Sequence, residues 1–169
     1  MNAKPSPQTS HEDHAAIVPR EGLDFGLDGD IPTYWMGGDA FKTRFFDAMS
    51  TLFPMGEKFF IISVRAFRDG VTSPQLQQEV TDFIRQEAQH TLIHRQFNDR
   101  LKAQGVDIDN INAQLETMFF VDAPKLSTPT QRLAATAALE HLTSMMCTCF
   151  FERKELLEAS DPRVRAMYA

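Results

Sequence analysis

The sequence is poor in cysteine, in long apolar runs and in blocks of like charge. Its two cysteines, Cys147 and Cys149, are separated by one residue and would point about 200° apart on a helix, which excludes a disulfide between them and a metal site that they share. No apolar run approaches the roughly 18–20 residues needed to cross a bilayer, and residues 1–20 lack the apolar stretch of a secretory signal. We therefore expect a cytoplasmic protein with no transmembrane segment.

Positive charge and strand-like alternation are also scarce. The 17 Lys and Arg residues against 23 Asp and Glu residues give a formal net charge of -6, which argues against nucleic acid as a partner. A chain of 169 residues with 43% hydrophobic content is long enough for one domain with a real core. Helical periodicity dominates, so the expected class is all-α, an up-and-down helical bundle.

Two regions differ in composition. Residues 1–35 are rich in Pro, Gly, Asp and Ser and show no sustained period, which predicts a flexible tail and then an irregular segment. His11 and His14 lie in this tail and are interpreted as solvated polar residues. Residues 36–169 carry the helical pattern and form the predicted bundle domain.

Turn and cap signals divide that domain into helices. We expect a first helix over residues 39–69 that is interrupted at Pro54-Met55-Gly56, and a second that is capped by Ser73 and runs to about residue 104. A short connector over 108–119 should be broken by residues 121–124. A third helix should begin at Thr128-Pro129 and continue to about residue 159, and a fourth should begin at Pro162.

An unusual polar stripe lies in the second helix, in the segment RQEAQHTLIH. Glu87, His90 and His94 are spaced at i, i+3 and i+7, so on a helix they share one face with the apolar Phe83 and Phe97. That face should point to the core, where an unpaired charge costs several kcal/mol. A partner for these groups is therefore required.

The first and third helices each place one acid on an apolar stripe. Glu57 lies among Phe53, Phe60 and Ile61, and Glu140 lies on a stripe with Leu133. Each residue taken alone is better explained by a core ion pair or a hydrogen-bonded histidine. Together they follow the ligand order of di-iron and di-manganese carboxylate bundles, in which a cation relieves the repulsion between carboxylates. We therefore predict a metal site made by Glu57, Glu87, His90 and Glu140.

The spacing of the acids extends this prediction. If the separation of Glu57 and Glu87 repeats after Glu140, a second Glu-x-x-His motif should lie near position 170, whereas the sequence ends at Ala169. We expect on this ground that the fourth helix is largely missing and that the bundle domain is incomplete at its C-terminus. An uncovered apolar seam would then favour a homodimer.

The segments FPMGEKFF, RQEAQHTLIH and AALEHLT resemble the bacterial family of predicted metal-dependent hydrolases, a group similar to ferritin-like di-iron proteins. The resemblance covers roughly residues 31–169 and implies a ferritin-like bundle. It also implies that Glu57, Glu87, His90 and Glu140 are metal ligands, with His94 as a further ligand or as a residue supporting them. The family pattern continues with a Trp-His and an acid-rich segment that this sequence does not contain.

Two functions remain open from the sequence. The first is a metal-dependent enzyme with a di-iron-type centre, in which two divalent metals, Fe or alternatively Mn or Zn, serve oxygen-dependent oxidation in preference to hydrolysis. Its substrate would be a small molecule, and the many phenylalanines admit a hydrophobic one. The alternative is a non-catalytic binding or structural protein with Glu and His paired in its core.

Overall fold

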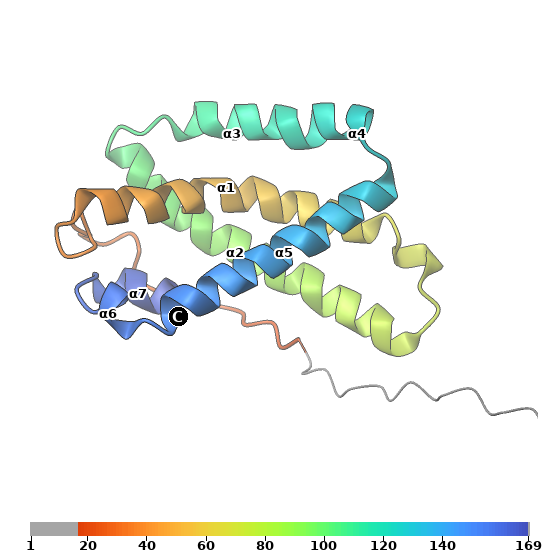
Figure 1. The fold of residues 1–169 in the computed structure, drawn as a ribbon, viewed down its shortest axis with the longest axis horizontal. Coiled ribbons are helices and arrows are strands. Elements are labelled where there is room, and N and C mark those ends of the chain that lie inside the picture. The colour runs from red at the N-terminus through yellow and green to blue at the C-terminus, as the bar shows by residue number, and fades with distance from the viewer. Residues whose placement is uncertain (1–16, 169) are drawn as a thin grey trace, which may run out of the picture.

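The computed structural model describes residues 17–168, and that part of the chain is helical, with no strand assigned in it (Figure 1). An isolated antiparallel bridge joins Met36 to Ser160. The predicted all-α class is confirmed. No helix within the described residues is long and apolar enough to span a membrane. His11 and His14 lie outside the described residues, as do the rest of segment 1–16 and Ala169.

The helices follow one another through short connections. In chain order they are α1 (Ala40–Arg65), η1 (Arg68–Gly70), α2 (Pro74–Ala103), α3 (Ile108–Glu116), the π-helical η2 (Thr117–Asp122), α4 (Ala123–Leu126), α5 (Pro129–Phe151), α6 (Lys154–Leu157) and α7 (Pro162–Tyr168). Helices α1 and α2 form a long antiparallel pair, against which α3 packs, while α5 crosses α1 (Figure 1). The pair α1–α2 is therefore the centre of the molecule.

The predicted helix starts are found where capping chemistry places them. Ser73 accepts a hydrogen bond from the backbone N of Leu76 at the start of α2, with Pro74 in the first helical position. Thr128 and Gln131 form a reciprocal capping box at the start of α5. Each device satisfies backbone N–H groups that the first helical turn leaves without a partner.

The predicted interruption at Pro54-Met55-Gly56 is wrong, because α1 runs unbroken through Pro54. A proline inside a helix has no N–H to donate to the carbonyl four residues earlier, here that of Ser50. The Nδ2 of Asn98, on α2, donates to this carbonyl at 2.9 Å. A side chain of the neighbouring helix thus replaces the missing backbone donor, and α1 continues.

Two further boundaries differ from those predicted. The chain does not break at residues 121–124 but remains helical to Leu126, through η2 and α4. Helix α5 ends at Phe151 and not near residue 159, and the short α6 follows it. The fourth predicted helix begins at Pro162 as expected, after Asp161, whose Oδ1 accepts from the backbone N of Arg163 at 2.9 Å.

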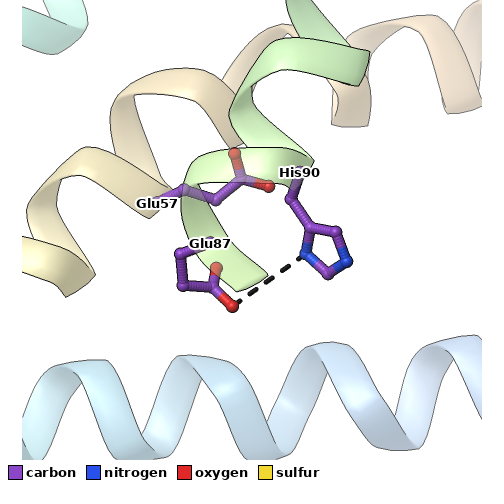
Figure 2. Close-up of side chains that lie close together, drawn as sticks. All are labelled: Glu57, Glu87 and His90. Carbon is purple, nitrogen blue, oxygen red and sulfur yellow. Dashed lines mark ion pairs between the residues drawn. The ribbon is translucent and has the colours of Figure 1, made fainter. Parts of the chain in front are cut away.

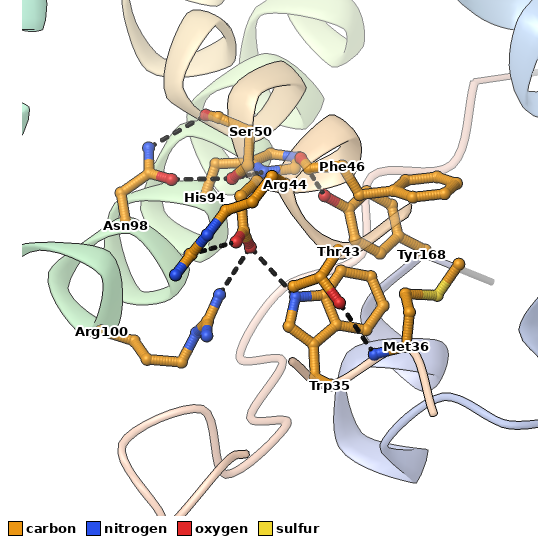
Figure 3. A network of polar contacts seen from close by, with 11 residues as sticks. Trp35, Met36, Thr43, Arg44, Phe46, Ser50, His94, Asn98, Arg100 and Tyr168 are labelled. Atoms are coloured by element: carbon orange, nitrogen blue, oxygen red, sulfur yellow. Dashed lines mark hydrogen bonds and ion pairs between the residues drawn. The ribbon is translucent and has the colours of Figure 1, made fainter. Parts of the chain in front are cut away.

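A buried tryptophan joins the N-terminal segment to the helical pair. Trp35 is 1% exposed and its Nε1 donates to Oδ1 of Asp47 at 3.0 Å. Arg100 of α2 donates to the same oxygen at 2.6 Å, and Arg44 to the other carboxylate oxygen at 2.8 Å (Figure 3). The core around Trp35 consists of Leu27, Ile31, Met36, Phe46, Ile93, Phe97, Leu157 and Val164. This core fastens the N-terminal segment and α7 to one end of the α1–α2 pair.

Candidate metal centre

Three side chains that could bind a metal come together on α1 and α2. Glu57 of α1 and Glu87 and His90 of α2 each offer one donor atom, and these three atoms lie within 4.8 Å of one another (Figure 2). Glu57 is 4% exposed and Glu87 is 2% exposed. The side chain of His90 is 54% exposed, and its Nδ1 lies 3.9 Å from Oε1 of Glu87. The group is thus two buried carboxyl groups with an imidazole at the surface.

Helical spacing and helix pairing together produce this group. Glu87 and His90 are three residues apart, which places them on one face of α2. Glu57 reaches them because α1 and α2 are antiparallel, with Thr91 facing Glu57 and Asn98 facing Ser50. Moving seven residues along one helix moves the contact seven residues back along the other. The two helices therefore present matching polar stripes over at least two turns.

The pKa values of the two buried carboxyl groups lie well above the ordinary range of glutamate. Burial raises the pKa of Glu57 to about 8; the hydrogen bond from Thr91 opposes this rise, and the charge of Glu140 adds to it. Burial likewise raises the pKa of Glu87 to about 8, with further contributions from Glu140 and Glu57. Both groups therefore bind protons at neutral pH more readily than ordinary carboxylates. A cation would remove this penalty by neutralising the charges directly.

Glu140 lies near the centre without joining the tight group. It is half-buried on α5, burial raises its pKa, and its charge reaches both Glu57 and Glu87. Among the described residues, the group within 4.8 Å contains Glu57, Glu87 and His90 but not Glu140. The structure therefore brings three of the predicted ligands together and sets the fourth on the helix that crosses them.

His94 belongs to a neighbouring polar layer. Its Nδ1 is 2.9 Å from the Oγ of Ser50, and its ring centroid is 4.5 Å from that of Phe53. Burial, together with a smaller effect of the charge of His90, lowers the pKa of His94 to about 3, so the ring is neutral at physiological pH. His94 is also outside the group of three. It follows His90 by one helical turn on the same face of α2.

Sequence reasoning did not identify the residues that support this centre. Thr91 Oγ1 donates to Glu57 Oε2 at 2.8 Å, and Ser50 contacts both His94 and Asn98. A signal for Asn98 was present, because it continues the polar stripe of Glu87 and His94 by one more turn. No sequence signal marked Thr91 or Ser50, since their roles depend on which residues of the other helix they meet.

Comparison with known proteins agrees with this chemistry. A family model described as predicted metal-dependent hydrolase matches residues 19–169, which include all five candidate metal residues. No curated protein and no solved structure matches the chain.

Proposed function

The chain belongs to the family of predicted metal-dependent hydrolases, and from that premise we propose that it is an enzyme whose metal ion is held by Glu57, Glu87 and His90. The observation that carries the proposal is the convergence of these three donors from two helices, two of them buried carboxyl groups. A purely structural role would leave two acids in the core at a high energetic cost. A metal ion accounts for both their types and their placement.

The donors fit a divalent metal of the first transition row. Two carboxylate oxygens and one imidazole nitrogen suit Fe, Mn or Zn. Copper(I) instead prefers soft thiolate ligands, which this group does not offer. Ligands bound to one ion at 2.0–2.2 Å lie at most about 4.4 Å from one another. The observed limit of 4.8 Å is close to this, so small side-chain rotations would complete the coordination. The half-exposed His90 leaves the centre open on one side.

We further propose that the full centre is binuclear and of the di-iron type. Glu57 from α1, Glu87 and His90 from α2 and Glu140 from α5 follow the helix order of carboxylate bundles that bind two metals. Glu140 already acts on both buried acids through its charge. In this proposal Glu140 would be a further ligand, and His94 would add a nitrogen ligand from the next turn.

Metal ions bound at such a centre supply either oxygen reduction coupled to oxidation of an organic substrate or a bound water of lowered pKa for hydrolysis. The carboxylate-rich donor set favours oxidation. Hydrolysis is the second candidate, and the family description favours it. Glu57 and Glu87 would lose their protons on binding the ion, and their negative charges would offset its positive charge. Phe53, beside His94, supports an apolar organic substrate for either reaction.

The most direct test is metal analysis of protein made without an affinity tag. Mass spectrometry of the metals should find between one and two transition-metal ions per chain. Protein reconstituted with Fe(II) under nitrogen should then consume oxygen on exposure to air if the centre is oxidative. Cleavage of simple esters or phosphodiesters without oxygen uptake would favour hydrolysis. If the protein binds no metal from solution, it is the non-catalytic alternative, with Glu57 and Glu87 held in the core as neutral acids.

A further inference from the structure

The orientation of the Asn98 side chain is determined by a proline on the facing helix. Pro54 cannot donate to the carbonyl of Ser50, and the amide of Asn98 takes that role, with Nδ2 donating at 2.9 Å. Only the nitrogen end of the amide can donate, so the nitrogen must face this carbonyl. The oxygen end, Oδ1, is consequently directed at the hydroxyl of Ser50, 2.8 Å away (Figure 3).

The hydroxyl of Ser50 then has no proton left for His94. A hydroxyl carries one hydrogen, and Ser50 donates it to Oδ1 of Asn98. The same Oγ lies 2.9 Å from Nδ1 of His94. For this second contact to be a hydrogen bond, the imidazole must be the donor. Ser50 is fully buried and Asn98 is 3% exposed, so water does not offer either group an alternative partner. The hydroxyl of Tyr168 also lies within hydrogen-bond reach of Ser50, but it donates its own hydrogen to the carbonyl of Phe46 at 3.2 Å and can only accept from Ser50.

His94 is surrounded by aromatic rings, with the ring centroid of Phe53 at 4.5 Å and that of Tyr168 at 6.1 Å. An imidazole in such surroundings is neutral and bears a single N–H. If that hydrogen is on Nδ1, then Nε2 carries a free electron pair. Histidines that bind metals show this arrangement, in which the ring nitrogen that does not bind the ion donates to a supporting oxygen.

We propose that Pro54, acting through Asn98 and Ser50, holds His94 in the Nδ1–H tautomer and so presents Nε2 as a ligand for a divalent cation beside His90. Ser50 and Asn98 are positioning residues in this arrangement. The assignment of the tautomer stands on the hydrogen bonds alone, whereas the cation rests on the function proposed above. The sequence PMGE after Leu52-Phe53 thereby places both Glu57 and the proline that orients His94 on one helix.

Long-range ¹H–¹⁵N NMR of the metal-free protein tests the tautomer directly, with His94→Gln used to assign the His94 signals. The expected spectrum of the parent protein shows a protonated Nδ1 and an unprotonated Nε2 at position 94. A protonated Nε2 in the parent protein would overturn the proposal. This measurement does not depend on metal binding, so it distinguishes failure of the tautomer from failure of the proposed function.

A double variant tests the chain of hydrogen bonds. Asn98→Leu alone leaves the carbonyl of Ser50 without a partner, and Pro54→Ala restores the backbone N–H that satisfies it. In Pro54→Ala/Asn98→Leu the hydroxyl of Ser50 is free to donate to His94, and the hydrogen should move to Nε2. Retention of the Nδ1–H form in this folded variant would show that Asn98 does not control the tautomer.

Titration with Zn²⁺ tests the ligand role. In the parent protein the Nε2 signal of His94 should shift on addition of Zn²⁺, and the double variant should bind Zn²⁺ about 10- to 100-fold more weakly. Zn²⁺ binding that shifts His90 but leaves His94 unchanged would refute the ligand role while retaining the metal site. Absence of any Zn²⁺ binding would instead refute the function proposed above.

Discussion

Thr91 on α2 donates a hydrogen bond of 2.8 Å to Oε2 of Glu57 on α1, joining two residues 34 positions apart in the chain. This bond stabilises the carboxylate form of Glu57 and opposes the rise in its pKa that burial causes. It also restricts the rotation of the carboxyl group, so that the other oxygen is available to a cation. Thr91 is therefore expected to contribute to metal affinity without touching the metal.

Replacing Thr91 with Val keeps the shape of the side chain and removes the hydroxyl. We expect Thr91→Val to lower metal affinity by about 10- to 100-fold, as is typical for the loss of a group that supports a ligand. Calorimetric titration with Zn²⁺ or Mn²⁺ measures the change. The matched control is Thr81→Val on the same helix, because Thr81 donates only to the carbonyl of Gln77. Equal effects of the two substitutions would contradict the role of Thr91.

Removing a central carboxylate should abolish most metal binding. We expect Glu87→Ala to lower metal content far more than Glu79→Ala, since Glu79 accepts an exposed hydrogen bond from Gln75 and lies away from the centre. The loss of affinity should be at least about 100-fold, above the range for supporting groups. Metal analysis of both purified variants decides the matter, and similar metal contents in the two would speak against Glu87 as a ligand.

Metal binding should depend on pH in a defined direction. The pKa of Glu57 and that of Glu87 are each about 8 in the metal-free protein, so below pH 8 the cation competes with protons for these groups. Affinity for a divalent metal should rise as pH increases from 6 to 8 and level off above it. Titrations in buffers with different ionisation enthalpies count the released protons, which should number between one and two. An affinity that does not change with pH would show that neither carboxyl group binds the ion.

The same pKa shifts predict how stability varies with pH when no metal is present. Groups whose pKa rises on folding stabilise the folded state below their unfolded pKa, here 4.5, and lose that contribution as pH rises through about 8. Glu57→Gln/Glu87→Gln removes both groups. The parent protein should therefore lose stability relative to this variant as pH rises from 5 to 8. The difference between their free energies of unfolding should change by at most about 1.4 kcal/mol per pH unit for each group. Glu79→Gln, at an exposed position of the same helix, is the control, and an equal pH dependence of the two variants would contradict the prediction.

The buried ion pair of Asp47 and Arg100, next to Trp35, should contribute to stability and not to metal binding. Asp47→Ala leaves the buried guanidinium of Arg100, whose side chain is 7% exposed, without its partner. We expect a loss of about 3–5 kcal/mol in the free energy of unfolding, followed by the fluorescence of Trp35, the single tryptophan of the chain. Asp109→Ala removes the exposed pair with Lys102 and should cost far less. A small loss for Asp47→Ala would show that Arg100 finds another partner.

Much of the secondary structure could be predicted because it depends on residues close together in sequence. Ser73 and Thr128 cap their helices through contacts three residues away, and Glu87 and His90 share a face of α2 because of helical periodicity. The placement of Glu57 on an apolar stripe follows from the same rule. These features need no knowledge of the rest of the fold.

Other features were decided only by how the helices meet. The continuation of α1 through Pro54 depends on Asn98 in α2, and local rules alone predicted a break. The position of Glu140 outside the tight group depends on where α5 crosses α1, and the hydrogen bond of Thr91 depends on the register of α1 against α2. The sequence by itself determined which residues share a face of each helix, because backbone geometry repeats every 3.6 residues. Which faces meet, and at which residues, was decided by the packing of side chains between helices, whose crossing and register have no local code.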